Sequence, residues 1–130
     1  MSVLVDTSVW VAFLRAEPAP TTGALRAAIK RRRAATTDQV VLELLAGARD
    51  ELDLQRLKRL VASLDYRPQD TPADAELAAD LYRACRRRGE TPRALADCLI
   101  GAVAIRTGLP VLHLDRDFIA LARYGGVPVA

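Results

Sequence analysis

Short apolar runs that alternate with longer helical stretches place the strongest constraint on the fold of this chain. Residues 3–5 and 111–114 are apolar runs of strand length, and an aspartate directly follows each. The longer segments carry apolar residues at helical spacing and are bounded by Pro and Gly. This alternation predicts an α/β fold in which a small parallel sheet is flanked by helices.

Capping residues and helix breakers predict where the helices begin and end. Thr71-Pro72 and Thr91-Pro92 each combine a capping residue with Pro at the first helical position. Gly89 and Gly108 are expected to end these two helices. We expect helices over about 9–14, 22–33, 38–47, 50–64, 72–88, 92–107 and 117–123, and short strands at 34–36, 66–68 and 127–129.

The composition is that of one folded domain. The chain has 130 residues, of which 51% are hydrophobic and 27% charged, which argues against disorder. No stretch approaches the roughly 20 apolar residues of a membrane span, and the first residues lack the basic start of a secretion signal. We expect a single domain over residues 1–130 in a reducing cytoplasm, away from membranes. Cys85 and Cys98 have no zinc-ligand spacing, and Cys98 is expected to be a small core residue.

Basic residues gather in two runs, each at the end of a predicted helix. With a formal net charge of +3, the chain is compatible with a nucleic-acid partner whose phosphates follow these runs. The runs are equally compatible with solvated faces that complement the helix dipole. Their candidate nucleic-acid-binding residues are Arg31, Arg32, Arg33, Arg86, Arg87 and Arg88.

Four acidic residues occupy positions that a solvated face does not explain. Asp6 and Asp115 follow predicted strands, and the carboxyl ends of parallel strands form the ligand crevice of open α/β sheets. Glu43 and Asp97 lie inside apolar helical segments. We expect these four side chains to gather at one edge of the sheet.

A glycine follows each helical acid by one turn. Gly47 is four residues after Glu43, and Gly101 is four residues after Asp97. Residues four apart share a helix face, so each carboxylate has an open neighbour where an ion or a backbone segment can approach. The alternative is that the two glycines only permit close helix packing.

A cluster of buried carboxylates requires protons or a cation. At about 5 Å and an effective dielectric constant of 20, each pair of charges costs about 3 kcal/mol. Oxygen ligands without His or Cys favour Mg²⁺ or Mn²⁺ over zinc. Such an ion can activate a water molecule beside a phosphate. Each acid taken alone is compatible with a structural role in a turn or an ion pair.

Four motifs in this order resemble those of PIN-domain ribonucleases, and the resemblance covers essentially the whole chain. Asp6-Thr7-Ser8 is similar to the first motif, and the helix around Glu43 to the second. Residues 95–100 around Asp97 resemble the third motif, and residues 112–118 the fourth. The spacing and length are similar to those of VapC-type toxins of bacterial toxin–antitoxin pairs.

The resemblance implies a PIN-like three-layer fold and a metal-dependent endoribonuclease that cleaves RNA phosphodiesters with Mg²⁺ or Mn²⁺. It implies that Asp6, Glu43, Asp97 and Asp115 are the catalytic, metal-binding acids. Asp6 and Asp97 are then the surest direct ligands, and Glu43 binds through water or orients it. Ser8 supports the site by hydrogen bonding.

The fourth motif leaves two assignments open. Either Asp115 or Asp117 supplies the fourth carboxylate, and the other caps the following helix. His113 stands where the family usually carries Thr. We favour a strand residue here over a contact with substrate.

The resemblance also implies partners. They are an RNA substrate, a second copy of the chain in a homodimer, and an antitoxin whose tail covers the acidic crevice and can insert an Arg among the carboxylates. The alternative is a non-catalytic α/β interaction module with structural acids. A haloacid-dehalogenase phosphatase requires a second Asp where Ser8 stands, so we exclude it.

Overall fold

Four short parallel strands form the centre of the structure, a computed structural model that describes residues 1–130. The strand order is β3-β2-β1-β4. Leu4 of β1 pairs with Ala35 of β2 on one side and with Val111 of β4 on the other. The first and last strands of the chain therefore lie side by side. The strands are β1 (Val3–Val5), β2 (Ala34–Thr36), β3 (Asp65–Tyr66) and β4 (Val111–Leu112).

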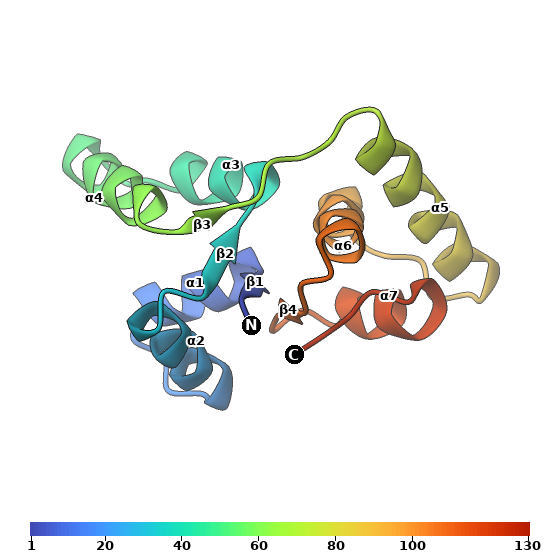
Figure 1. The fold of residues 1–130 in the computed structure, drawn as a ribbon, viewed down its shortest axis with the longest axis horizontal. Helices are drawn as coiled ribbons and strands as arrows, with labels where there is room; N and C mark the ends of the chain where they lie inside the picture. Colours follow the sequence, from blue (N-terminus) through green and yellow to red (C-terminus); the bar gives the residue numbers. More distant parts are fainter.

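Seven helices surround this sheet and confirm the predicted α/β fold. In Figure 1, α1 to α4 lie on the left of the molecule and α5, α6 and α7 on the right. The two groups meet where α3 contacts α6. The helices are α1 (Thr7–Leu14), α2 (Pro20–Lys30), α3 (Asp38–Ala46), α4 (Glu51–Ala62), α5 (Ala73–Arg87), α6 (Leu95–Thr107) and α7 (Asp117–Gly125).

One continuous core joins the sheet to both groups of helices. It contains 24 buried residues, among them Leu4 of β1, Trp10 of α1 and Phe118 of α7. Cys85 and Cys98 are free thiols within it, as predicted for Cys98. Burying a large apolar side chain contributes about 1.5–3 kcal/mol, so this core fixes the strand ends that carry the acids.

Helix α1 begins two residues earlier than predicted. Asp6 has extended backbone angles and accepts a hydrogen bond from the Ser8 amide at 3.1 Å, so it is the N-cap. A capping carboxylate satisfies one of the unpaired amides of the first turn. The residue after β1 therefore both starts α1 and faces the edge of the sheet.

Helices α5 and α6 both begin later than predicted, at Ala73 in place of Pro72 and at Leu95 in place of Pro92. Thr91 does not cap α6. Instead the Asp117 carboxylate accepts hydrogen bonds from the Arg93 and Ala94 amides, at 2.9 and 3.2 Å. At α5, Asp74 accepts from the Asp70 amide at 2.7 Å. The prediction from the Thr-Pro pairs was therefore wrong by one residue at α5 and by three residues at α6, where the distant Asp117 carboxylate takes the place of the local cap.

The C-terminal segment forms less strand than predicted. Strand β4 ends at Leu112 because the Leu114 amide donates to the Ser8 hydroxyl, at 3.0 Å, rather than to a neighbouring strand. The predicted edge strand at 127–129 is reduced to a single parallel bridge between Val111 and Val129. Helix α2 stops at Lys30, before the predicted residue 33. None of the seven helices has the length and apolar character needed to cross a membrane.

Candidate active site

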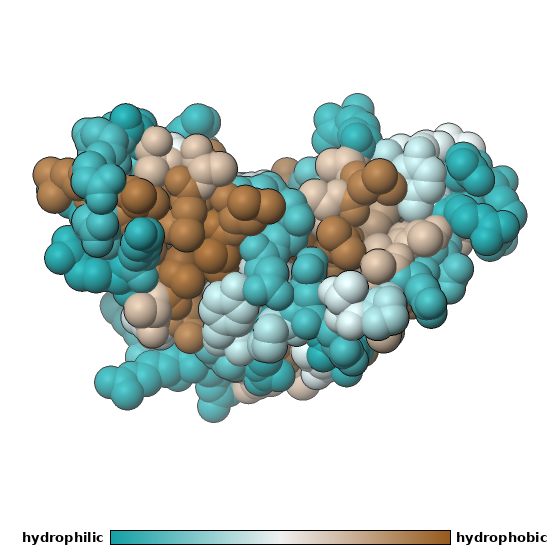
Figure 2. Space-filling view, turned by 90° about the horizontal axis from the view of Figure 1, so that it is seen from above, coloured by the Kyte–Doolittle hydropathy of each residue, from teal (hydrophilic) through white to brown (hydrophobic).

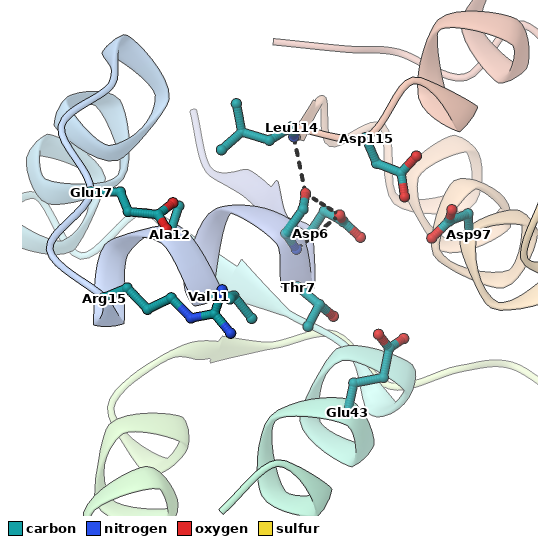
Figure 3. A pocket seen from close by; sticks show the side chains of 11 residues that line it. Asp6, Thr7, Val11, Ala12, Arg15, Glu17, Glu43, Asp97, Leu114 and Asp115 are labelled. Carbon is teal, nitrogen blue, oxygen red and sulfur yellow. Dashed lines mark hydrogen bonds between the residues drawn. The ribbon is translucent and has the colours of Figure 1, made fainter.

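All four predicted acids line one cleft of about 430 Å³ at the carboxyl edge of β1 and β4. Asp6 comes from the end of β1, Glu43 from α3, Asp97 from α6 and Asp115 from the segment between β4 and α7. Figure 3 shows their carboxylates directed toward one another from three sides. Segments far apart in the sequence therefore supply one acidic centre, as the sequence predicted.

Ser8 fixes the Asp6 side chain and joins it to the end of the chain. Its amide and hydroxyl both donate to Oδ2 of Asp6. The same hydroxyl accepts from the Leu114 amide at 3.0 Å. Because both donors reach Oδ2, Oδ1 of Asp6 is free for another ligand. Burial raises the pKa of Asp6, so keeping this carboxylate ionised costs free energy.

Asp97 is the acid of the cleft whose charge is least compensated by the protein. It lies in the first turn of α6, is 7% exposed, and its Oδ2 atom has no hydrogen-bond partner. Burial and the adjacent Asp117 carboxylate raise its pKa to about 9. Its pKa is also raised by the charges of Asp6 and Asp115. In the absence of a cation, Asp97 is therefore protonated at neutral pH.

Asp115 is held by two donors that share one oxygen. Nη2 of Arg93 lies 3.1 Å from Oδ1, and the Asp117 amide donates to the same atom at 2.9 Å. Oδ2 of Asp115 thus remains available toward the cleft. Arg93 is 60% exposed, and its Nε atom also lies 3.5 Å from Asp117.

Asp117 is tied into the protein more tightly than Asp115. Its carboxylate accepts from the amides of Arg93 and Ala94. Burial acts to raise the pKa of Asp117, but hydrogen bonds from Asp97 and from these amides outweigh it and leave that pKa below its usual value. Asp115 lines the cleft and Asp117 does not. Asp117 instead holds the start of α6 and does not cap the following helix α7.

The site fits a hard divalent cation. Asp97, Asp115 and Asp117 each offer a carboxylate oxygen within 4.8 Å of the others. The buried Oδ2 of Asp97 has no protein partner, and an unpaired buried oxygen calls for a donor or a cation. Only oxygen ligands are present, as Mg²⁺ and Mn²⁺ prefer.

Glu43 occupies the opposite side of the cleft, on α3. Its Oε1 atom accepts from the Gln39 side chain at 3.1 Å, one turn earlier in the same helix. Gly47, one turn later, has only backbone oxygens of α3 within 4 Å of a Cβ and lines the adjoining groove. The open face expected beside Glu43 is therefore present.

Gly101 has the packing role that was the alternative interpretation. A Cβ at Gly101 would lie 3.0 Å from Cγ2 of Val127 and 3.5 Å from Leu81. The glycine therefore lets α6 approach α5 and the C-terminal segment, and it leaves no room for an ion. The expectation of an open neighbour beside Asp97 was wrong, because that face of α6 is turned into the core.

His113 follows directly after the end of β4. Its ring packs on Phe118 with the centroids 5.2 Å apart, and it does not line the cleft. His113 is therefore a packing residue. It is not a strand residue as predicted, because β4 ends at Leu112.

The six arginines of the basic runs lie away from the acids. The Arg33 carbonyl accepts from the Val3 amide at 2.9 Å, which places residues 31–33 at the amino end of β1, opposite Asp6. Arg86 stacks on Tyr82, and Arg88 stacks on Tyr124. None of the six lines the cleft.

Sequence reasoning missed several residues of the cleft. Arg15 and Glu17 line it, as do Thr7 and Val11. Thr7, Val11 and Arg15 are spaced by four residues and so share one face of α1. This spacing from the first motif was the signal that could have identified Arg15.

An apolar groove of about 800 Å³ adjoins the cleft between α1, α3 and α4. The two share Val11, Arg15 and Glu43. Figure 2 shows apolar side chains gathered on the side of the molecule where α3 and α4 lie. The apolar lining of the groove comprises Val11, Leu14, Leu44, Leu57 and Leu60.

The sequence and the fold both match known proteins. Residues 3–124 match the PIN domain family. The chain is 40% identical over 135 residues to the VapC ribonuclease Mb1587 of Mycobacterium bovis and to ribonuclease VapC11 of Mycobacterium tuberculosis, covering 98% of this chain and 97% of each relative. The chain belongs to the PIN-domain family. Its relatives at this level of identity carry the name VapC ribonuclease.

Solved structures support the same fold at lower identity. VapBC2 from Rickettsia felis, bound to a DNA fragment from its promoter, superposes with a TM-score of 0.79 at 16% identity and covers 100% of this chain and 98% of that one. FitAcB from Neisseria gonorrhoeae gives a TM-score of 0.74 at 24% identity, covering 98% and 95%. These likenesses confirm the PIN-like architecture.

Proposed function

We propose that this protein is a Mg²⁺- or Mn²⁺-dependent endoribonuclease and the toxin of a toxin–antitoxin pair. The observation that carries the proposal is the convergence of Asp6, Glu43, Asp97 and Asp115 in one cleft. The 40% identity to VapC ribonucleases over 98% of the chain supports RNA as the substrate.

Asp6, Asp97 and Asp115 would hold the metal through their free oxygens. Ser8 orients Asp6, and Arg93 with the Asp117 amide orients Asp115. Asp97 must give up its proton before its carboxylate can bind a cation. Glu43, held by Gln39, would bind the ion through water or orient the attacking water. When bound, the metal would lower the pKa of that water and stabilise charge on the phosphate.

The test is cleavage of total RNA by the purified protein with Mg²⁺ or Mn²⁺. We expect fragments from the wild type and none from Asp6→Asn, which keeps a capping oxygen for α1. Asp80→Asn is the matched control, because Asp80 is an exposed acid of α5 outside the cleft. Full activity of Asp6→Asn would contradict the assignment.

Metal binding separates the nuclease from a non-catalytic interaction module. Mn²⁺ is expected to raise the melting temperature of the wild type by binding the folded state alone. The shift should disappear in Asp6→Asn and persist in Asp80→Asn. An unchanged melting temperature in all three proteins would favour the module, whose acids are structural.

The apolar groove supports an antitoxin as the partner. We propose that an amphipathic antitoxin segment fills the groove between α1, α3 and α4 and extends a basic residue into the acidic cleft. The groove and cleft are continuous through Val11 and Arg15, so one segment can occupy both. Leu14, which lines the groove, is 51% exposed.

Co-purification tests this partner surface. Leu14→Glu is expected to reduce recovery of a co-expressed, tagged antitoxin, whereas Val129→Glu, an exposed apolar position outside the groove, is not. Equal recovery with both variants would place the antitoxin elsewhere.

A homodimer is also proposed. Leu95, Leu114 and Ile119 are 64%, 49% and 54% exposed, and a contact between two copies would cover apolar side chains of this kind. Light scattering should give twice the chain mass of 14.1 kDa for the wild type and less for Ile119→Glu. A monomeric wild type would contradict it.

A further inference from the structure

Arg15 is the one basic residue among the side chains that line the acidic cleft. It is the C-cap of α1, directly after Leu14, and it is exposed. No ion pair or side-chain hydrogen bond engages it, although Glu17 lies two residues away. Arg93 is different, since both Asp115 and Asp117 hold it. Arg93 is thus held by carboxylates of the protein, whereas Arg15 is free to bind a ligand.

Helix α1 holds Arg15 at a fixed distance from Asp6. Arg15 is nine positions after Asp6, and a rise of about 1.5 Å per residue places the two about 13.5 Å apart along the helix axis. Side chains on a helix lean toward its N-terminus, so the arginine extends back along α1 toward the acids. Figure 3 shows the Arg15 side chain passing beneath Val11 on the side of Thr7.

The charge of the cleft gives this arginine a function. Five acidic residues line the cleft, namely Asp6, Glu17, Glu43, Asp97 and Asp115. One divalent ion offsets two negative charges, so the metal-loaded cleft would still repel an RNA backbone. A guanidinium group at the rim supplies attraction where the phosphates enter, and it can bind one phosphate with two parallel hydrogen bonds.

We propose that Arg15 is a substrate-binding residue that contacts an RNA phosphate neighbouring the one that is cleaved. This inference rests on the proposed ribonuclease function. It identifies Arg15 as one end of the path that the RNA backbone follows through the cleft. The path runs from Arg15, along the α1 face of Thr7 and Val11, to Asp6. It excludes the basic runs at residues 31–33 and 86–88, which lie away from the cleft.

The experiment measures steady-state cleavage of a short single-stranded RNA carrying a fluorophore and a quencher. Arg15→Ala is expected to raise KM about tenfold, with kcat within about twofold of wild type. Arg15→Lys should recover part of the KM, because it keeps the charge but loses the paired hydrogen bonds. The dependence of log(kcat/KM) on log salt should weaken by about 0.7, the value for one phosphate contact on a single strand.

Arg59→Ala is the control, because Arg59 is an exposed arginine of α4 outside both the cleft and the groove. An equal KM in Arg15→Ala and Arg59→Ala would overturn the proposal. Equal KM values together with weaker antitoxin recovery in Arg15→Ala would assign the residue to the antitoxin instead.

The Mn²⁺-induced rise in melting temperature distinguishes failure of this inference from failure of the proposed function. Arg15→Ala is expected to keep that rise in full, since Arg15 holds no metal-binding oxygen. A wild type that neither cleaves RNA nor responds to Mn²⁺ would remove the proposed function itself. A wild type that does both, alongside an Arg15→Ala variant with unchanged KM, would remove only the role of Arg15.

Discussion

The two walls of the cleft present their acids under different constraints. On the α6–α7 wall, Asp97, Asp115 and Asp117 lie together. Asp115 and Asp117 accept hydrogen bonds from Arg93 and from backbone amides, whereas Oδ2 of Asp97 has no partner. On the α1–α3 wall, Asp6 is bound to Ser8, Glu43 to Gln39, and Arg15 to no partner. The first wall, called the crowded wall, carries three carboxylates whose negative charge is partly compensated by Arg93 and by backbone amides. The second wall is open to ligands and is called the open wall.

This difference separates effects on stability from effects on activity. Changes on the crowded wall are expected to alter both the folded state and cleavage, because those carboxylates interact strongly with one another. Changes on the open wall are expected to alter mainly what the cleft binds.

The largest expected effect is the loss of cleavage in Asp97→Asn. Loss of groups that only support a metal ligand costs about 10–100-fold, so loss of a ligand is expected to exceed about 100-fold. The variant should remain folded, because Asn resembles the protonated carboxyl that occupies the metal-free site. RNA cleavage and circular dichroism test the two parts, with Asp80→Asn as control. Substantial cleavage by Asp97→Asn would show that the crowded wall does not hold the metal.

Arg93→Ala is expected to reduce cleavage about tenfold, as removal of a residue that orients a metal ligand does. Asp115 would lose the donor at 3.1 Å that holds Oδ1. The concentration of Mn²⁺ needed for half-maximal cleavage should rise, and Arg93→Lys should restore part of it. Arg59→Ala is the matched control. An unchanged Mn²⁺ requirement would mean that the Asp117 amide alone orients Asp115.

Metal binding is expected to depend on pH because the cation must displace the proton of Asp97, whose pKa is about 9. Apparent Mn²⁺ affinity should rise with pH from about 6 to 9, by at most about tenfold per pH unit for one displaced proton. Calorimetry in two buffers of different ionisation enthalpy measures that proton, and it should be absent in Asp97→Asn. An affinity independent of pH in the wild type would contradict the raised pKa.

The stability of the metal-free protein should change in the opposite sense. Folding raises the pKa of Asp97 above its value of 3.8 in model compounds, so the folded state binds a proton that the unfolded state releases. Stability therefore falls as pH rises from about 4 toward 9, by at most about 1.4 kcal/mol per pH unit for this group. Chemical unfolding at pH 6 and pH 9 should show a larger decrease for the wild type than for Asp97→Asn.

The smallest expected effect on cleavage is that of Gly101→Ala, which tests the packing behind the crowded wall. The added Cβ would press on Val127, whose Cγ2 lies 3.0 Å away, and should cost about 1–3 kcal/mol, while cleavage at a temperature well below the transition stays near wild type. Gly23→Ala is the control, because a Cβ there meets nothing within 4 Å. It should be neutral or slightly stabilising. A loss of cleavage without a loss of stability would mean that α6 moves when the site acts.

The convergence of the four acids in one cleft could be predicted because their signals are local. Asp6 and Asp115 follow apolar strand runs, and Glu43 and Asp97 interrupt apolar helix faces, so each position stands out against its neighbours. The parallel sheet then brings the strand ends together. The fold class follows from the same alternation of short and long segments.

The features that could not be predicted depend on contacts between distant segments. The Thr91-Pro92 signal is local, but α6 begins where Asp117 accepts the amides of Arg93 and Ala94. The basic runs stand out in the sequence, yet Arg15 lines the cleft because α1 carries it there. A local pattern identifies a candidate side chain, and tertiary contacts decide whether it reaches the site.

The hydrogen bond from the Leu114 amide to the Ser8 hydroxyl joins residues 106 positions apart, and this has a consequence for biosynthesis. The ribosome makes Ser8 106 residues before Leu114. At roughly 5–20 residues per second, about 5–20 s pass between the two ends of that bond. A nascent chain, or one cut before residue 115, therefore has no complete acidic centre, and the cell meets the assembled cleft only after residue 115 has been translated.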